Sequence, residues 1–251
     1  MIAGIFHIGS GLGNQLHRYV ATRVLALDKG YDFSMVAPEN FKGKSFMNLD
    51  TGKEWSYAYK IYEGSGKVEL TYPNKPLWEE KTPYYNPEFN FIEDNTIIDG
   101  EFQDERYFEH RLKEIDEWLH VKHLDILDDV CVIGFRGGEF YVFPELGLPK
   151  SYFDEGISKM KNINPNMRFE VHTDDIELAS KFFPDYKITH DIGINWRSVR
   201  YAKYALIANS SFYILPRLLN GGVTIAPRYW DRYNIKKWER PYNYYKEFTY
   251  I

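Results

Sequence analysis

The feature that most constrains the fold is a regular alternation of strand-like and helix-like segments between residues 130 and 227. Short apolar runs alternate with segments whose apolar residues recur every three or four positions. Strands separated by helices pair in parallel, so this alternation predicts a parallel sheet covered on both faces. The predicted strands are 130–135, 167–173, 186–190, 206–210 and 223–227, and the predicted helices are 151–163, 174–183, 195–205 and 211–221.

The first part of the chain begins in the same way. Residues 2–8 predict a buried strand, and residues 14–29 predict a helix that Gly30 ends. Residues 95–103 predict another strand, followed by a helix over 104–119. We expect Asp104 to cap that helix and Phe108, Leu112, Ile115 and Leu119 to form its apolar face.

These patterns predict an α/β protein of two Rossmann-like domains. A chain of 251 residues is long enough to bury a core in each. We expect an N-terminal α/β domain over 1–128, a C-terminal Rossmann-like domain over 129–230, and a tail over 231–251 that packs back on the first domain. The pattern is weak between about residues 32 and 93, and long irregular segments inside compact domains tend to be functional.

Composition and charge exclude several classes of protein. The formal net charge is −5 and no long run of Lys or Arg is present, which argues against a nucleic-acid partner. The single cysteine, Cys131, cannot form an internal disulfide. The apolar stretch at residues 1–8 is too short for a signal peptide or a transmembrane segment, so we expect a cytoplasmic protein. Aromatic residues make up 18% of the chain, which suits a sugar site as well as a core.

A glycine-rich turn, "HIGSGLGNQLHRYV", joins the first predicted strand to its helix. A dinucleotide-binding fingerprint would need a third glycine where Asn14 stands, although Asp32 has the right spacing to bind a ribose. No Gly-Lys-Ser/Thr directly follows these glycines, which excludes a Walker A loop here. Glycines needed only for tight packing of the turn remain the alternative. Asn14 and Gln15 add two side-chain amides beside the free N–H groups of a helix terminus, a set that can bind hydroxyls or phosphate oxygens.

Gly-Leu-Gly-Asn-Gln followed by a helix resembles the N-terminal motif of the alpha-1,2-fucosyltransferases and, more loosely, of the fucosyltransferase superfamily that includes the O- and alpha-1,6-enzymes. Other segments resemble that family in the same order along the chain. They are "GEFQDERYF" from Gly100, "GFRGGEF" around Arg136, "HTDD" ending at Asp175, "IANSSF" from Ile207 and "VTIAPRYW" from Val223.

The resemblance implies a GT-B arrangement, in which two Rossmann-like domains face a cleft and the second holds most of the donor. It implies an inverting glycosyltransferase that moves fucose, or a related deoxyhexose, from a GDP-sugar to a hydroxyl of an oligosaccharide or other glycan. The sequence has no Asp-x-Asp, which favours a scheme without a metal or other cofactor. Arg136 would instead neutralise the departing diphosphate, since a guanidinium offers two parallel donors to phosphate oxygens.

Other residues have a functional and a structural interpretation. Ser210 and Ser211 precede a predicted helix and bind phosphate, cap that helix, or do both, since capping needs only one of them. Asp174 or Asp175 either accepts hydrogen bonds from guanine or caps the helix that follows. Thr173 is a further candidate for that cap. The predicted catalytic residues are Arg136, Glu139 and Asn14, and the predicted donor-binding residues are Gly11, Gly13, Asn14, Gln15, Arg136, Asp174, Asp175, Asn209, Ser210, Ser211 and Phe212.

The chain departs from the family pattern at three positions around Arg136. Gly134 replaces a histidine, Gly137 replaces a second arginine, and Glu139 replaces an aspartate. Glu139 is either the general base for the acceptor hydroxyl or a partner of Arg136, and Asp99 and Glu101 are rival bases. His7 and His17 we expect to be packing or polar helix residues. Two other functions stay open: an NAD(P)-binding Rossmann oxidoreductase, and a catalytically inactive glycan-binding relative.

Overall fold

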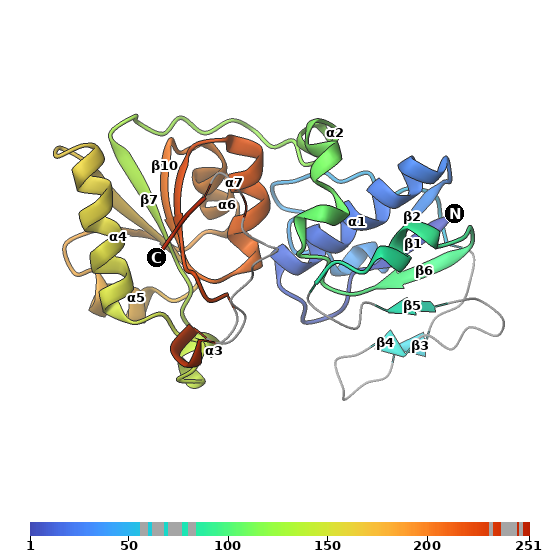
Figure 1. Ribbon diagram of the computed structural model, residues 1–251, viewed down its shortest axis with the longest axis horizontal. Helices are drawn as coiled ribbons and strands as arrows, with labels where there is room; N and C mark the ends of the chain where they lie inside the picture. Colours follow the sequence, from blue (N-terminus) through green and yellow to red (C-terminus); the bar gives the residue numbers. More distant parts are fainter. Residues whose placement is uncertain are drawn as a thin grey trace. The chain divides into compact units, whose positions relative to one another are not determined.

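The computed structural model describes residues 1–55, 60–61, 68–69, 77–79, 84–230, 233–236, 245 and 248–251 (Figure 1). The chain divides into two compact units, Met1–His120 and Val121–Ile251. The division falls before the expected position at 128/129, because the segment after residue 120 packs within the second unit. The Tyr201 hydroxyl donates to the Val121 carbonyl at 3.1 Å, and the rings of His123 and Tyr201 lie 4.3 Å apart.

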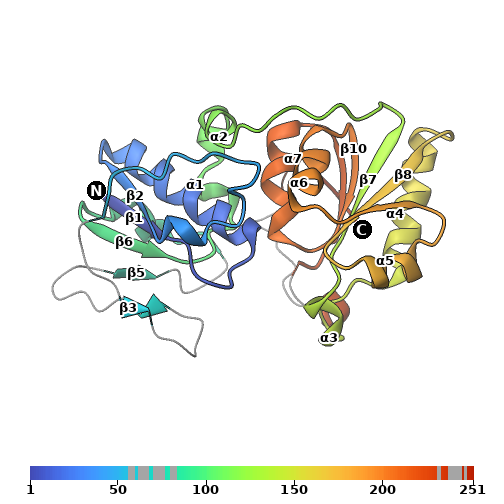
Figure 2. The ribbon, with the colours of Figure 1, turned by 180° about the vertical axis from the view of Figure 1, so that it is seen from behind.

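The first unit is built on a four-stranded sheet in the order β2-β1-β6-β5, with every pair parallel. Helix α1 (Leu12–Lys29) follows β1, as the sequence predicts (Figure 2). Gly30 ends α1 in the left-handed conformation, φ 68°, and its N–H bonds back to the Ala26 and Leu27 carbonyls. The strands are β1 (Ile2–Ile5), β2 (Phe33–Val36), β5 (Leu77–Glu79) and β6 (Thr96–Asp99), and β3 (Lys60–Ile61) and β4 (Val68–Glu69) form a separate antiparallel pair.

The expected helix over 104–119 is broken into three short pieces, η3 (Glu105–Tyr107), η4 (Glu109–Arg111) and α2 (Leu112–Trp118). Asp104 caps η3 by accepting from the Arg106 N–H, and its buried carboxylate also holds the Arg106 guanidinium. Tyr107 turns into a cluster of aromatic rings with Phe89 and Phe102. Burial of these rings explains why the local pattern does not continue as one helix. Two further 3-10 turns are η1 (Pro38–Asn40) and η2 (Pro87–Phe91).

The second unit is a six-stranded parallel sheet in the order β12-β11-β10-β7-β8-β9. Helices α4 and α5 cover one face of this sheet and α6 and α7 cover the other (Figures 1 and 2). The predicted parallel sheet with two covered faces is therefore confirmed. Its elements are β7 (Val130–Phe135), α3 (Glu139–Val142), α4 (Lys150–Ile163), β8 (Arg168–Thr173), α5 (Ile176–Phe182), β9 (Lys187–Thr189), α6 (Ile192–Tyr201), β10 (Tyr204–Ile207), η5 (Ser211–Tyr213), α7 (Ile214–Asn220), β11 (Val223–Ala226), η6 (Tyr233–Ile235) and β12 (Phe248–Tyr250).

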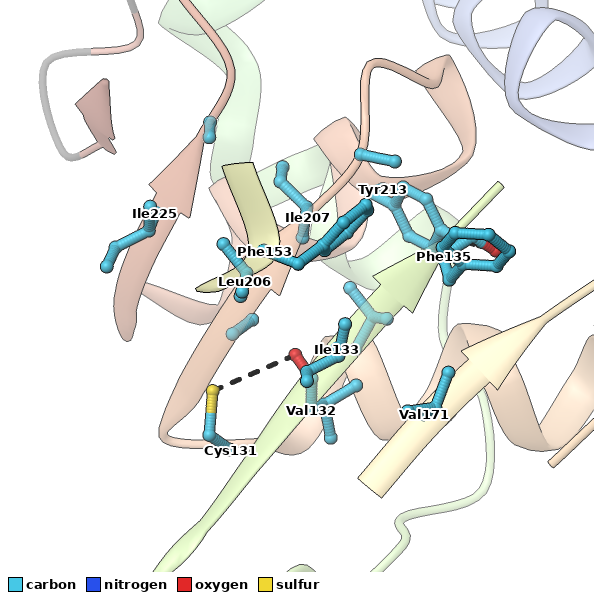
Figure 3. Close-up of a cluster of buried hydrophobic side chains, with 14 of the residues drawn as sticks. Cys131, Val132, Ile133, Phe135, Phe153, Val171, Leu206, Ile207, Tyr213 and Ile225 are labelled. Atoms are coloured by element: carbon cyan, nitrogen blue, oxygen red, sulfur yellow. Dashed lines mark hydrogen bonds between the residues drawn. The ribbon is translucent and has the colours of Figure 1, made fainter. Parts of the chain in front are cut away.

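Strand β7 lies at the centre of the second unit's core, with all six of its residues buried (Figure 3). Such a run, apolar on both faces, is what a central parallel strand requires. Gly156 allows α4 to pack closely on β10, since a Cβ at residue 156 would lie 2.4 Å from a methyl carbon of Leu206. Cys131 is fully buried, and burial raises the pKa of its thiol to about 12. This cysteine is a packing residue.

The end of the C-terminal tail does not follow expectation. Phe248–Tyr250 forms β12 and pairs in parallel with β11 of the second sheet. The Ile251 N–H donates to the Ala226 carbonyl, and the Arg228 N–H donates to the Ile251 carbonyl. β12 covers the hydrogen-bonding edge that β11 would otherwise leave open. Residues 231–232, 237–244 and 246–247 of the tail lie outside the described residues. Within the described parts of the chain, no helix combines the length and apolarity needed to cross a bilayer.

Candidate functional site

The glycine-rich turn lies at the carboxyl end of β1. Gly9 has φ 81°, which favours glycine, whereas Gly11 has φ −65° and caps α1 with no side-chain hydrogen bond. A Cβ added at Gly11 would meet no described atom within 4 Å. Packing within this unit therefore gives no reason for glycine at residue 11, and open space lies beside the start of α1. Gly13 is buried in the first turn, where its carbonyl accepts from His17 Nδ1.

Asn14 lies beside a carboxylate at the end of β6. Its amide nitrogen donates to Glu101 Oε1 at 3.0 Å. Gln103 Nε2 donates both to Asn14 Oδ1 at 3.1 Å and to Glu101 Oε2 at 3.0 Å. The two amides therefore fix the orientation of the Glu101 carboxylate. Sequence reasoning missed Gln103, although its spacing of two from Glu101 within "GEFQ" could have indicated it.

Gln15, expected to share this role, lies elsewhere. Its side chain is fully buried, donates from Nε2 to the Asn40 carbonyl at 2.8 Å, and accepts the Lys42 N–H at 2.9 Å. Asn40 in turn donates to the Phe6 carbonyl. Gln15 thus ties the loop after β2 to the helix, and this placement indicates a structural role.

Asp99 ends β6 and is held by two basic side chains. His7 Nε2 lies 2.9 Å from Asp99 Oδ1, and Arg18 Nε lies 3.3 Å from the same oxygen. Partial burial raises the pKa of Asp99, but the hydrogen bond from His7 and the charge of Arg18 outweigh it, so the pKa lies below the usual value. Arg18 also donates to the Gly100 and Ile5 carbonyls. Asp99 is therefore a poor base and a structural anchor.

Asp32 does not lie where a dinucleotide-binding fold would need it. It precedes β2, which begins at Phe33, and its carboxylate pairs with Lys53 at 2.6 Å. Ligands of open parallel sheets bind at the carboxyl ends of the strands, and Asp32 lies at the amino end of its strand. Together with the missing third glycine, this position argues against the oxidoreductase alternative.

A second polar cluster lies at the carboxyl ends of β7 and β8. Arg136 follows β7, and its guanidinium donates to Asp174 and, at 3.2 Å, to Glu139 Oε1. The Phe140 ring lies 5.3 Å from the guanidinium carbon and adds a cation–π contact. The Arg136 side chain is 28% exposed, so it is held in place and still faces solvent. Phe140 is a member of this cluster that sequence reasoning missed.

Two aspartates shape the turn that follows Arg136. Asp174 accepts the Gly137 N–H at 2.8 Å, and Asp175 accepts the Gly138 N–H at 3.0 Å. Asp175, not Asp174 or Thr173, caps α5 by accepting the Leu178 N–H. The Leu178 and Gly138 N–H groups hold the pKa of Asp175 below its usual value. Both oxygens of Asp175 are thus engaged with backbone, which favours the capping interpretation over recognition of guanine by this residue.

Close packing explains the two glycines at which the chain departs from the family pattern. A Cβ at Gly134 would lie 2.7 Å from the Tyr213 ring, and one at Gly137 would lie 2.4 Å from Asp175 Cβ. Tyr213 is buried and donates to the Phe135 carbonyl at 3.2 Å. Tyr213 of η5 and Asp175, which caps α5, therefore occupy the space that larger residues at 134 and 137 would need.

The "ANSSF" segment follows β10, the neighbour of β7, at the same edge of the sheet. Asn209 is buried, and its side chain donates to the Leu146 carbonyl at 3.0 Å, which holds the loop after α3 in place. Ser210 caps η5 by accepting the Phe212 N–H. Ser210, Ser211 and Phe212 are half-buried. The predicted site residues thus form two clusters, one in each unit, and the described residues contain no group of three or more His, Cys, Asp or Glu suited to a metal ion.

Comparison with known proteins gives distant structural neighbours only. No protein-family model matches the chain, and no curated protein matches it in sequence. Similar solved structures include the fucosyltransferase NodZ from Bradyrhizobium, with a TM-score of 0.42 and 14% identity over 86% of this chain and 93% of that chain. Another is an Arabidopsis thaliana FUT1 mutant in complex with GDP, with a TM-score of 0.48 and 11% identity over 91% and 70% of the two chains. A glycosyl transferase family 9 protein from Veillonella parvula has a TM-score of 0.44 and 10% identity over 90% and 80%. At such distances, function has to be argued from the residues.

Proposed function

We propose that this protein is an inverting, metal-independent glycosyltransferase of GT-B type that moves fucose, or a related deoxyhexose, from a GDP-sugar to a glycan hydroxyl. The observation that carries the proposal is Arg136: a half-buried guanidinium at the carboxyl end of a central parallel strand, oriented by a carboxylate on each Nη. Carboxylates and phosphates use the same donors of a guanidinium, so a site that binds two carboxylate oxygens can bind a diphosphate.

The two carboxylates differ in how firmly they are held. Asp174 also accepts the Gly137 N–H, which anchors it. Glu139 is 70% exposed, and its described contact is an ion pair with Nη2 of Arg136. We expect the diphosphate to displace Glu139 and Asp174 to keep the guanidinium in position. The hydroxyls of Ser210 and Ser211, at the end of the neighbouring strand, would add donors to the same anion. Gly138, at φ 52°, keeps the backbone free of a side chain there.

In the transfer step, the acceptor oxygen bonds to the anomeric carbon as the bond from that carbon to the diphosphate oxygen breaks. The electron pair of the broken bond goes to GDP, where Arg136 stabilises the charge, and the acceptor proton goes to a carboxylate. Glu139, which the diphosphate would displace from Arg136, is the predicted base. Of its two rivals in the first unit, Glu101 suits the role better than Asp99, because His7 and Arg18 lower the pKa of Asp99 and make it a weaker base. Asn14 would orient Glu101 toward the acceptor.

The test is a ligand panel on the full chain followed by a transfer assay. Thermal unfolding is measured with GDP, GDP-fucose, UDP and NADH, since a ligand at a hundred times its Kd stabilises the folded state by about 2.7 kcal/mol. We expect stabilisation by GDP and GDP-fucose, and release of GDP from GDP-fucose when a glycan acceptor is added. Stabilisation by NADH alone would contradict the proposal, and donor binding without release of sugar, with or without acceptor, would indicate an inactive relative.

A further inference from the structure

His190 lies at the same edge of the second sheet as the cluster around Arg136. β7, β8 and β9 are neighbours in that sheet and pair in parallel, and Arg136, Asp174 and His190 are the residues that directly follow them. β7 and β8 can be followed in Figure 2. Ligands of open parallel sheets bind outside the carboxyl ends of the strands, so His190 is placed among the groups that a ligand bound at Arg136 would meet.

The backbone fixes the tautomer of the His190 ring. Nδ1 lies 3.1 Å from the Thr173 carbonyl, which also accepts from Asn195 Nδ2 at 2.9 Å. A carbonyl can only accept, so Nδ1 carries the proton of the neutral ring and Nε2 is an acceptor. His190 is exposed, and none of the residues that the structure describes donates to Nε2. Nε2 is therefore an oriented acceptor that a ligand can use.

The two aspartates near this histidine are already engaged. Asp174 holds Arg136 and accepts a backbone N–H, and both oxygens of Asp175 accept backbone N–H groups. Either aspartate would have to give up or share such a bond in order to accept from a base. Nε2 of His190 has no such bond to give up, so His190 is the better placed of the three to accept one.

Apolar surface suited to the faces of a base follows the same strand ends. Ile176 begins α5 and is 52% exposed, and Ile192 begins α6 and is 38% exposed. Ligand sites combine such apolar surface with a few polar groups that fix orientation. Neighbouring strands lie about 4.8 Å apart, so the ends of β7 and β9 are separated by about 10 Å. That separation suits a nucleotide that reaches from a diphosphate at Arg136 to a base at His190.

We propose that His190 selects guanine: its Nε2 accepts from the N1–H or the 2-amino group of the base of a bound GDP-sugar. The inference rests on the proposed function, because Arg136 decides where the diphosphate lies. Guanine presents these two donors side by side, whereas adenine presents at the same positions a ring nitrogen that only accepts and a C–H. The hydrogen bond therefore favours GDP over ADP, and pyrophosphate, which has no base, does not engage it.

Calorimetric titration of the full chain with GDP, ADP and pyrophosphate tests this assignment at pH 8, which favours the neutral ring. His190→Phe keeps a ring and removes the acceptor. We expect it to weaken GDP binding about three- to tenfold, the ratio for one hydrogen bond, and to reduce the preference for GDP over ADP by the same factor. Pyrophosphate binding should not change. An unchanged preference, or an equal loss of affinity for GDP and pyrophosphate, would overturn the assignment.

His123→Phe is the matched control. His123 is an exposed histidine of the same unit, and its ring lies 4.3 Å from that of Tyr201, at the other end of α6 from His190. This variant should bind all three ligands as the native chain does, and His190→Gln, which keeps an acceptor, should retain more of the preference for GDP than His190→Phe. Circular dichroism checks that each variant is folded.

The same titrations separate this inference from the proposed function. GDP binding that survives Arg136→Ala, or no GDP binding by the native chain, would refute the anion site and the base site together. GDP binding that depends on Arg136 and is unchanged in His190→Phe would refute the role of His190 alone.

Discussion

The two units contain the same strand-turn-helix design but place their arginines differently. In the first unit, the Arg18 side chain is 7% exposed and donates to two backbone carbonyls beside Asp99. In the second, the Arg136 side chain is 28% exposed, and within the described residues its contacts are two side-chain carboxylates and a ring. Backbone carbonyls cannot move aside for a ligand, whereas an exposed carboxylate can. The comparison indicates that anion binding belongs to the second cluster, and that the first, with its amides around Glu101, is suited to hydroxyl groups.

The largest effect should come from Arg136→Ala. Loss of one preorganised electrostatic group costs about 10²–10³-fold in turnover, so transfer should fall by that factor while the free energy of unfolding changes little. Arg168→Ala is the control, since Arg168 begins β8, at the opposite end of the strand from Asp174, and its guanidinium binds both oxygens of one carboxylate, Asp129. Initial rates with GDP-fucose and denaturant unfolding check both variants. Near-normal transfer by Arg136→Ala would remove the anion site from the second unit.

Arg18→Met should show the reverse pattern, a loss of stability. The change leaves the Ile5 and Gly100 carbonyls without the Arg18 donor and removes the positive charge beside Asp99, which we expect to lower the free energy of unfolding by about 2 kcal/mol. Urea unfolding measures this change. A variant that is as stable as the native protein and fails to bind GDP would show that the buried arginine, too, serves a ligand.

Asn14 and Gln15 offer a sharper contrast within one helical turn. Asn14→Ala should lower turnover about tenfold, by analogy with other groups that position a general base, and change stability by less than about 0.5 kcal/mol. Gln15→Ala should instead destabilise the fold by about 1–3 kcal/mol, because it orphans the Asn40 carbonyl and the Lys42 N–H. Rates are measured well below the melting temperature of each variant. Similar profiles for the two variants would contradict the division of roles.

The smallest expected effect is a pH dependence of the first unit. The pKa of Asp99 is lower in the folded chain than in the unfolded one, so the unfolded state binds more protons in acid. Its contribution to stability is complete above the usual pKa of an aspartate and is lost as the pH falls through the lowered value. Asp99→Asn should flatten this acid limb of the stability curve relative to the control Asp125→Asn, which removes a fully exposed carboxylate. An unchanged slope in Asp99→Asn would show that His7 and Arg18 do not hold this carboxylate.

Sequence periodicity predicted the order of elements in the second unit because they are decided by local pattern. It misplaced one boundary, since β10 (Tyr204–Ile207) begins within the helix predicted over 195–205. The strands around β7 are continuous apolar runs, and the helices between them have single apolar faces. The break within 104–119 could not be predicted, because burial of Tyr107 against distant rings overrides helical propensity. The pairing of β12, which begins at Phe248, with β11 likewise depends on long-range contacts that no local sequence pattern indicates.

Within the candidate site, the positions of the clusters followed from motifs at strand ends, but the roles of neighbouring residues did not. Gln15 is a structural residue because a loop far along the chain supplies its partners. Asp175, and not Asp174, caps α5, and the Gly137–Gly138 turn packs closely against it. Sequence spacing alone cannot decide which of two adjacent aspartates takes the cap. The roles of Asn14, Arg136 and the two serines as ligands of a donor or acceptor stay predictions.

The burial of Cys131 has a practical consequence. In the folded chain the one thiol lies in the core around β7, so maleimides and oxidants reach it only after unfolding. A cysteine introduced on the surface of each unit could therefore carry a fluorescent dye without prior removal of the native residue. Energy transfer between such labels would report whether nucleotide changes the separation of the two units. The extent of labelling at Cys131 would measure the fraction of molecules in which the second unit has unfolded.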